Sequence, residues 1–155
     1  MNEIYLGFKN GLTMDEVKIF ANSKRAPNKM KQIRLGLEHS LGDKVNHYKD
    51  FLSHNDMRSI RVLFERDLHP DYLNYIFSMS YLDERLDHKQ LLIAGLGVLC
   101  KIQHNDISKM VKSKKYCNAL YHSFSHATGS RHVDSESILE NFKSSFNRYY
   151  KKLSQ

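Results

Sequence analysis

The stretch MKQIRLGLEHSL, residues 30–41, carries the pattern that decides the fold. Its apolar residues are spaced as one stripe along an α-helix: Met30, Ile33, Leu37 and Leu41. A glycine, Gly36, stands beside this stripe, although glycine in a helix costs about 0.5–1 kcal/mol relative to alanine. We therefore expect Gly36 to serve packing, by letting a neighbouring helix approach closely.

The same pattern occurs three more times along the chain. It begins 29 residues earlier at Met1, 27 residues later at Met57, and in a weaker form at Leu91. Each copy is followed by a second signal, an acidic residue before aliphatic ones: DEVKIF (15–20), DKVNHY (43–48), DYLNYI (71–76) and NDISKM (105–110). Gly36 has counterparts in Gly7 and Gly97, and the third copy has Leu63 there. An internal repeat of this length is typical of stacked supersecondary units.

Each copy is predicted to form two helices, because strand-like alternation is nearly absent and helix punctuation is frequent. Thr13 and Glu16 form a capping box, and Pro27 and Pro70 precede helical runs. The predicted fold is all-α: stacked short helical hairpins in a single domain, residues 1–155, closed by a C-terminal capping helix. The predicted repeats span approximately 1–29, 30–56, 57–90 and 91–118, and a basic helical cap spans 119–155.

The cap is predicted to contain one loop and one long helix. ATGSRH (127–132) is the strongest loop signal, and Asp134 or Ser135 is a suitable N-cap for the helix that follows. The apolar face of that helix comprises Ile138, Leu139, Phe142, Phe146, Tyr149, Tyr150 and Leu153. This face could seal the end of a helical stack or bind a partner, and the pattern does not separate the two.

The second copy resembles a known tandem repeat. Proteins of conjugative elements and phages of low-GC Gram-positive bacteria carry the repeat Q-M-x-x-I-R-x-G-L-E-x-G-L, followed by a V-x-x-Y-A-like step. KMKQIRLGLEHSLGDKVNHY (29–48) is similar to this repeat, and residues 1–20 and 57–76 look like degenerate copies. The resemblance implies helical repeats and a mobile-element origin, and it assigns no catalytic residues. Tyr5 and Gly95 stand where the repeat has arginine.

Composition and charge point to a folded protein with one basic end. Hydrophobic residues make up 41% of the chain, and no apolar run approaches the length of a membrane span. The N-terminus lacks the order of a signal peptide, so a cytoplasmic location is expected, with Cys100 and Cys117 reduced. Residues 1–100 hold 14 Lys/Arg and 13 Asp/Glu, whereas residues 101–155 hold 10 and 4. Such an excess favours an anionic partner.

The candidate partner-binding residues at the basic end combine cations with neighbouring aromatic rings, as phosphate contact and base stacking require. They are Lys112, Lys114, Lys115, Arg131, Arg148, Lys151 and Lys152. If the ATGSRH loop reverses the chain, the two lysine-rich clusters converge on one face. A smaller cluster, Lys24, Arg25, Lys29 and Lys31, surrounds Pro27. The alternative is a solvated face that binds nothing.

Arg34 and Arg61 are further candidates, because they occupy the same repeat position and would present one cation per copy to a carboxylate or phosphate. Each is also four residues before a glutamate, Glu38 or Glu65, with which it can pair within its own helix. Partner binding and intrachain pairing are both open at this point.

Metal binding and catalysis are not favoured. His122 and His126 are spaced i, i+4, with Cys117 and His132 nearby, but no H-E-x-x-H or C-x-x-C motif accompanies them. Cys117 follows KSKKY, whose charge would lower the thiol pKa, with His122 possible as a base. No oxyanion-hole, phosphate-loop or dinucleotide motif supports an enzyme. We predict no metal, no cofactor and no catalytic residue.

The leading expectation is a non-enzymatic binding protein of a phage or mobile element that inhibits or modulates a host factor. An anti-CRISPR protein that binds a ribonucleoprotein nuclease is a specific example, and it rests on the resemblance. The alternative is a nucleic-acid-binding regulator or accessory factor of mobile-element replication or transfer. A small hydrolase or metal enzyme using Cys117, His122 and His126 is the third and weakest. No membrane partner is expected, and the oligomeric state is not predicted.

Overall fold

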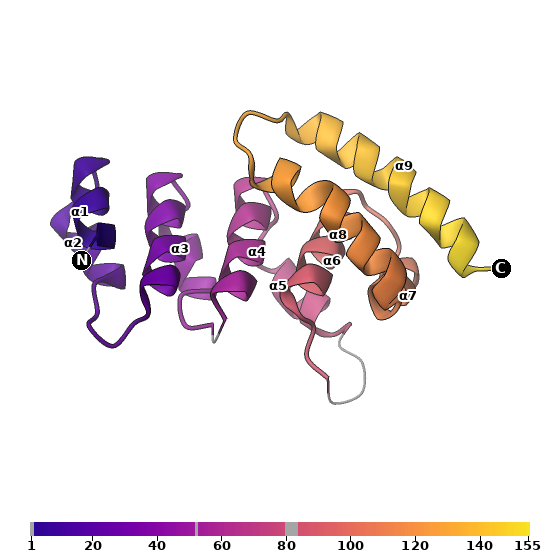
Figure 1. The fold of residues 1–155 in the computed structure, drawn as a ribbon, viewed down its shortest axis with the longest axis horizontal. Coiled ribbons are helices and arrows are strands. Elements are labelled where there is room, and N and C mark those ends of the chain that lie inside the picture. Colours follow the sequence, from indigo (N-terminus) through magenta and orange to yellow (C-terminus); the bar gives the residue numbers. More distant parts are fainter. Residues whose placement is uncertain (1, 52, 80–83) are drawn as a thin grey trace. The chain divides into compact units, whose positions relative to one another are not determined.

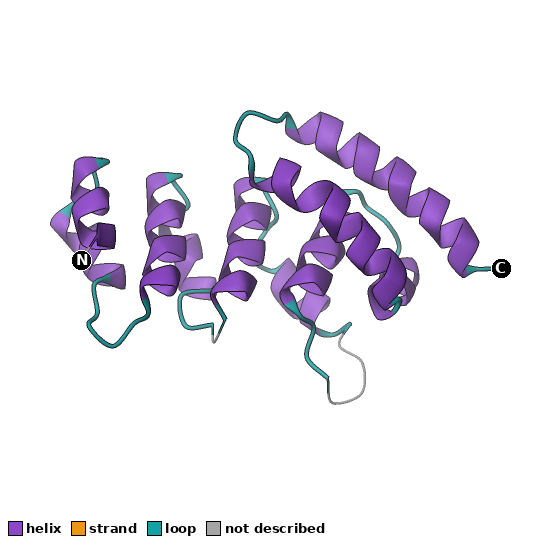
Figure 2. Cartoon of the chain, viewed as in Figure 1, coloured by secondary structure: helices purple, strands orange, loops and turns teal. Residues whose placement is uncertain are grey.

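The computed structural model describes residues 2–51, 53–79 and 84–155, and the regular elements in this part of the chain are all helical (Figures 1 and 2). The predicted all-α class is therefore confirmed. The elements are α1 (Asn2–Lys9), α2 (Met14–Phe20), α3 (Pro27–Glu38), the 3₁₀-helix η1 (Gly42–His47), α4 (His54–Glu65), α5 (Tyr72–Phe77), α6 (His88–Leu99), α7 (His104–Lys112), α8 (Lys114–Gly129) and α9 (Ser135–Leu153). Met1, the first residue of the repeat pattern, lies outside the described residues.

The chain divides into two compact units, Met1–Glu65 and Arg66–Gln155. In the first unit α3 packs against α1, α2, η1 and α4. In the second unit α8 packs against α6, α7 and α9, and α6 also contacts α5, α7 and α9. Among the described helices, none is both long and apolar enough to cross a membrane.

The helix that opens each repeat copy ends in the same way. Four residues after the glycine position, the backbone enters the left-handed region at Gly11, Ser40, Asp67 and Lys101. In three copies the next N–H donates back to the carbonyl at the glycine position: Leu12 to Gly7 (2.9 Å), Leu41 to Gly36 (2.9 Å) and Ile102 to Gly97 (3.0 Å). These bonds define a Schellman C-cap, which turns the chain sharply toward the second element of the copy. The periodic sequence positions thus carry a periodic backbone conformation.

Gly36 allows the element that follows the turn to pack closely against α3. A Cβ on Gly36 would collide with Oη of Tyr48 and lie 2.9 Å from a methyl carbon of Val45. Both partners belong to the following element, η1 and its C-cap. At Gly97 an added Cβ would lie 2.9 Å from Ile107, at the corresponding place on α7. These contacts support the predicted packing role of Gly36 and Gly97.

The helix starts agree with the punctuation in most places. Thr13 and Glu16 form the predicted capping box of α2, Pro27 is the first residue of α3, and Asp134 caps α9 by accepting from the N–H of Ser137. A second capping box, Asp87 with Gln90, begins α6. The second element of copy two is a 3₁₀-helix, because DKVNHY packs as a short tight turn under Gly36.

The C-terminal part of the chain is a hairpin of two long helices. α8 and α9 run side by side in opposite directions (Figure 1), and their interior face buries Leu120, Phe124, Phe142 and Phe146. The loop begins later than the ATGSRH signal predicts, because α8 continues through Gly129. The predicted boundary between repeats and cap, at residue 118, falls inside α8. The buried face of α8 continues on both sides of residue 118, so the helix does not end at the predicted boundary.

Candidate functional site

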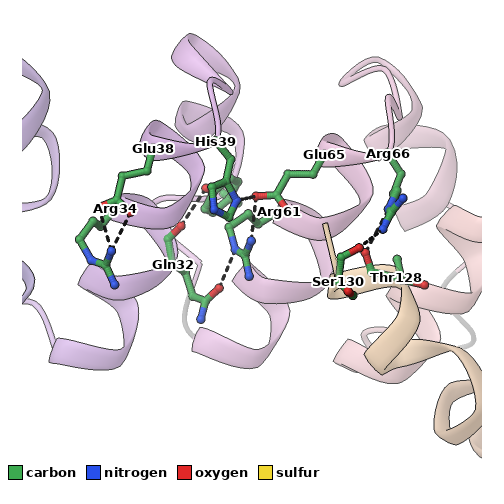
Figure 3. Close-up of polar contacts among 10 residues, drawn as sticks. Gln32, Arg34, Glu38, His39, Arg61, Glu65, Arg66, Thr128 and Ser130 are labelled. Atoms are coloured by element: carbon green, nitrogen blue, oxygen red, sulfur yellow. Dashed lines mark hydrogen bonds and ion pairs between the residues drawn. The ribbon is translucent and has the colours of Figure 1, made fainter. Parts of the chain in front are cut away.

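The repeated arginines form buried polar clamps within the first unit (Figure 3). Arg34 in α3 donates from Nε to Oε2 of Glu3 in α1, at 2.6 Å, and from Nη1 to both carboxylate oxygens of Glu38, at 2.8 Å. Glu38 accepts a further hydrogen bond from the side chain of Asn10, at 2.9 Å. Burial alone would lower the pKa of Arg34, but the hydrogen bonds and charges of Glu3 and Glu38 outweigh it and raise the pKa. Arg34 is therefore a fixed cation between two carboxylates.

The next copy repeats this clamp with the same two nitrogen atoms of its arginine. Arg61 in α4 donates from Nε to Oε1 of Gln32 (2.9 Å) and from Nη1 to Oε1 of Glu65 (2.8 Å). Glu65 contacts Nδ1 of His39 at 2.5 Å. The acceptors Glu3 and Gln32 are equivalent repeat positions, 29 residues apart, and so are Asn10 and His39. Each arginine–glutamate pair thus grips two polar side chains of the preceding copy.

Intrachain pairing is the role that the contacts give to Arg34 and Arg61. Each residue is only 6% exposed, and the hydrogen bonds of its guanidinium described above all go to side chains of the same unit. The backbone of Gln32 is also held, because its backbone carbonyl oxygen accepts a hydrogen bond from Oη of Tyr48 at 3.1 Å. The two arginines do not form an exposed row of cations.

Arg66 closes the C-terminal hairpin of the second unit. It follows α4 at the repeat position of Asn10 and His39, and its guanidinium donates to backbone carbonyls of Ala127, Thr128, Ser130 and Val133 and to Oγ of Ser135 (Figure 3 labels Thr128 and Ser130). Three of these bonds are 3.3, 3.2 and 2.6 Å long, to Ala127, Thr128 and Val133. A cation at the C-terminal end of α8 satisfies carbonyls that have no helical partner.

The other end of the α8–α9 hairpin carries a cluster of cations and tyrosines, which we call the basic tyrosine face: Lys115, Tyr116, Arg148, Tyr149 and Lys152. The rings of Tyr116 and Tyr149 pack with centroids 5.4 Å apart and planes tilted by 31°. Lys115 lies 5.5 Å from the Tyr116 centroid, and Arg148 and Lys152 lie 5.2 and 5.8 Å from that of Tyr149. The reversal of the chain between the helices therefore places Lys115 of the first cation cluster, and Arg148 and Lys152 of the second, on two rings that contact each other.

The charges around this face are arranged against helix stability on α8. Its first turn contains Lys114 and Lys115 and no acidic residue, although the N-terminal end of a helix favours negative charge. On α9 the basic residues Lys151 and Lys152 occupy the last turn, where cations are favoured. Asp106 of α7 accepts from Oη of Tyr150, the residue after Tyr149, at 2.7 Å. A cation-rich α8 start gains from an anion bound nearby.

The remaining predicted cations lie apart from the tyrosine pair to different degrees. Lys112 and Lys114 line a hollow of about 130 Å³ together with Glu84 and Arg85. Lys151 is exposed next to the face, whereas Arg131 is exposed in the turn at the opposite end of the hairpin. A helix of the length of α8 separates the two ends by about 1.5 Å per residue, so Arg131 does not join the face.

The smaller cluster around Pro27 also lines a hollow in the first unit. Lys24, Arg25 and Lys29 meet Lys49 around a space of about 300 Å³, and Lys31 is not among its lining residues. Arg25 is partly committed, since it donates to the carbonyl of Ile19 at 3.3 Å and lies 3.7 Å from Asp50. Four cations and one carboxylate, that of Asp50, therefore line this hollow.

The pKa of the Cys117 thiol is raised, whereas the neighbouring lysines in the sequence predict that it is lowered. The residue is 1% exposed on the inner side of α8, and burial raises the pKa of its thiol to about 12, with Asp87 adding to the rise and Lys89 opposing it. Burial likewise raises the pKa of Cys100 to about 11, against the charge of Lys143, and its Sγ donates to the carbonyl of Leu139. Both cysteines are free thiols. The basic residues near Cys117 in sequence point away from it, because α8 buries one face.

The histidine pair lies where the spacing predicts but without further ligands. His122 and His126 are both exposed on α8. No group of three or more His, Cys, Asp or Glu side chains placed to hold a metal ion occurs among the described residues. The absence of a metal stays a prediction.

Sequence reasoning missed the partners of the clamps and the role of Arg66. The polar pairs Glu3/Gln32 and Asn10/His39 recur at the repeat offset among apolar neighbours, and this signal could have found them. Arg66 occupies the repeat position of Asn10 and His39, but no periodic signal marks its partners in the α8–α9 turn or the contact between Tyr116 and Tyr149. No protein-family model matches the chain, and searches of curated proteins and of solved structures find no match either.

Proposed function

We propose that the protein acts by binding, and that the basic tyrosine face binds nucleic acid, either free or exposed on a ribonucleoprotein. The observation that carries the proposal is the Tyr116–Tyr149 ring pair with Lys115, Arg148 and Lys152 around it. Exposed cations attract phosphates, and aromatic rings among them contact bases or sugars. The two lysines at the start of α8 support the same partner, because their electrostatic cost is offset when a polyanion binds.

Binding is favoured over catalysis by the state of the candidate nucleophiles. A thiol whose pKa is raised to about 12 by burial is not a thiolate near neutral pH. Arg34 and Arg61 are held by side chains of their own unit, so they do not support a second binding surface on the repeats.

The biological setting of the proposal comes from the repeat resemblance. On a phage or conjugative element, such binding would regulate replication or transfer of the element, or inhibit a host ribonucleoprotein nuclease such as a CRISPR effector. A pull-down from host lysate, with and without nuclease treatment, separates the two: loss of all partners after treatment supports the first, and a retained nuclease complex supports the second.

The central test is fluorescence anisotropy with labelled RNA and DNA oligonucleotides of about 20 nucleotides across a salt series. We expect affinity to fall steeply with salt, with a slope of about 0.7–0.9 per neutralised phosphate. The triple variant Lys115→Gln, Arg148→Gln, Lys152→Gln is expected to lose at least about tenfold in affinity. The control Lys9→Gln, Lys18→Gln, Lys31→Gln removes the same charge from exposed sites in the first unit and is expected to lose little.

Two outcomes would contradict the proposal. Equal losses in both triple variants would indicate only nonspecific attraction by net charge. Equal binding of polyglutamate of matched length would indicate an acidic protein surface as the partner, because polyglutamate offers charge but no bases.

A further inference from the structure

We infer that the basic tyrosine face selects single-stranded over duplex nucleic acid. This inference rests on the proposed function, and it names the class of ligand that the same face takes. A surface that meets duplex phosphates alone needs only charge, whereas this face has two aromatic rings at its centre.

The rings are partly accessible. Tyr116 and Tyr149 are both half-buried, and Lys115 and Lys152, which lie over them, are exposed. Exposed lysine side chains move readily, so a base can displace the ammonium group from a ring while that group pairs with the adjoining phosphate. The ring thereby exchanges a cation–π contact for base stacking, and the cation keeps a negative partner.

A duplex cannot make this exchange. Its bases are stacked on each other and present only their edges in the grooves, so a tyrosine face would need unstacked bases to act on. The tyrosines also come from antiparallel helices, with Tyr116 in the first turn of α8 and Tyr149 near the end of α9. The contact between the buried rings of Phe124 in α8 and Phe142 in α9 fixes the two helices against each other, which preorganises the tyrosine pair.

The test compares three labelled probes of about 15 nucleotides: an unstructured oligouridylate, the matching oligothymidylate, and a blunt duplex of the same length. The expected result is single-strand affinity at least about tenfold above duplex affinity at a fixed salt concentration. Preference between the two single strands reports whether the sugar is also read. Duplex affinity equal to or above that of both single strands would overturn the inference.

The ring contribution is tested with Tyr116→Leu and Tyr149→Leu, each compared with its phenylalanine variant. Leucine is expected to lower single-strand affinity by about fivefold or more while leaving duplex affinity and the salt slope unchanged. Phenylalanine keeps a stacking face and is expected to restore the affinity. Equal affinities for leucine and phenylalanine variants would refute ring stacking, and thermal melting of the phenylalanine variants shows whether the hairpin stays folded.

Tyrosine fluorescence gives an independent readout, because the chain has no tryptophan. A single strand is expected to quench emission of the wild type more than that of Tyr116→Phe, Tyr149→Phe. The two hypotheses also fail separately. If none of the three probes binds, the proposed function fails. If all bind equally and the charge variants still weaken binding, only the preference for single strands fails.

Discussion

Gly36 shows how one missing side chain shapes a repeat. An added Cβ would collide with Oη of Tyr48, whose hydroxyl already donates to the carbonyl of Gln32. We expect Gly36→Ala to lower the free energy of unfolding by about 1–3 kcal/mol, since overpacking outweighs the helix propensity gained. Urea denaturation with a helix-sensitive signal measures the change.

A second substitution at the colliding atom separates collision from other effects of the alanine. Tyr48→Phe removes the hydroxyl, so Gly36→Ala is expected to cost less in the Tyr48→Phe background than in the wild type. Gly7→Ala, where the nearest atom of Phe20 lies at 3.0 Å, is expected to cost less than Gly36→Ala. Additive effects of Gly36→Ala and Tyr48→Phe would show that the hydroxyl is not the obstacle.

Because the thiol of Cys117 is buried, we expect the protein to lose stability at alkaline pH. Burial raises the pKa of its thiol from 9.0 to about 12, with Asp87 contributing, so the folded chain keeps a proton that the unfolded chain releases. The stabilisation from this group is complete below about pH 9 and is lost as the pH rises toward about 12. Urea midpoints measured from about pH 8 upward are expected to fall, and to fall less steeply for Cys117→Ala. An identical slope in that variant would contradict the assignment.

At the scale of helices, the clamps of Arg34 and Arg61 supply polar contacts between helices, which a single amphipathic helix cannot make alone. In copy two the position of Glu3 is occupied by Gln32, which serves Arg61 with an amide oxygen. Glu3→Gln is therefore expected to cost less than about 1 kcal/mol. Glu3→Ala leaves Nε of Arg34 without this partner and is expected to cost about 1.5–3 kcal/mol. Chemical denaturation of both variants gives the comparison.

The control for this prediction is Asn2→Ala, an exposed position on the same helix. It is expected to leave the free energy of unfolding nearly unchanged, because it removes no buried partner. If Glu3→Gln were as costly as Glu3→Ala, the clamp would depend on the charge of Glu3, and the equivalence between the two copies would be only geometric.

For the whole molecule, the basic end is expected to trade stability for binding. Lys114 and Lys115 place positive charge in the first turn of α8, where it is unfavourable. Lys114→Gln, Lys115→Gln is therefore expected to leave the melting temperature unchanged or to raise it slightly, while weakening oligonucleotide binding. Differential scanning fluorimetry at low salt measures the first and anisotropy the second. A lower melting temperature would show that these lysines stabilise the fold.

The candidate site was only partly predictable from the sequence. The two lysine-rich clusters were identified from composition, and the turn between them was expected from ATGSRH. The pairing of Tyr116 with Tyr149 depends on the register of α8 against α9, which is set by buried contacts such as that of Phe124 with Phe142. For Arg34 and Arg61 the sequence pattern left two roles open, intrachain pairing and partner binding. The buried hydrogen bonds of both guanidinium groups show that they pair within their own unit.

By itself the sequence determined the all-α class, the capping box at Thr13, the start of α3 at Pro27 and the positions of the close-packed glycines. Local interactions govern all of these, because a helix, its caps and its tight turn are encoded within a few residues. Only the tertiary structure decided that Arg34 grips Glu3, that Arg66 caps α8 and that Cys117 is a buried thiol. Those features depend on which faces meet across long separations in the chain, and burial then sets both the partners and the pKa values.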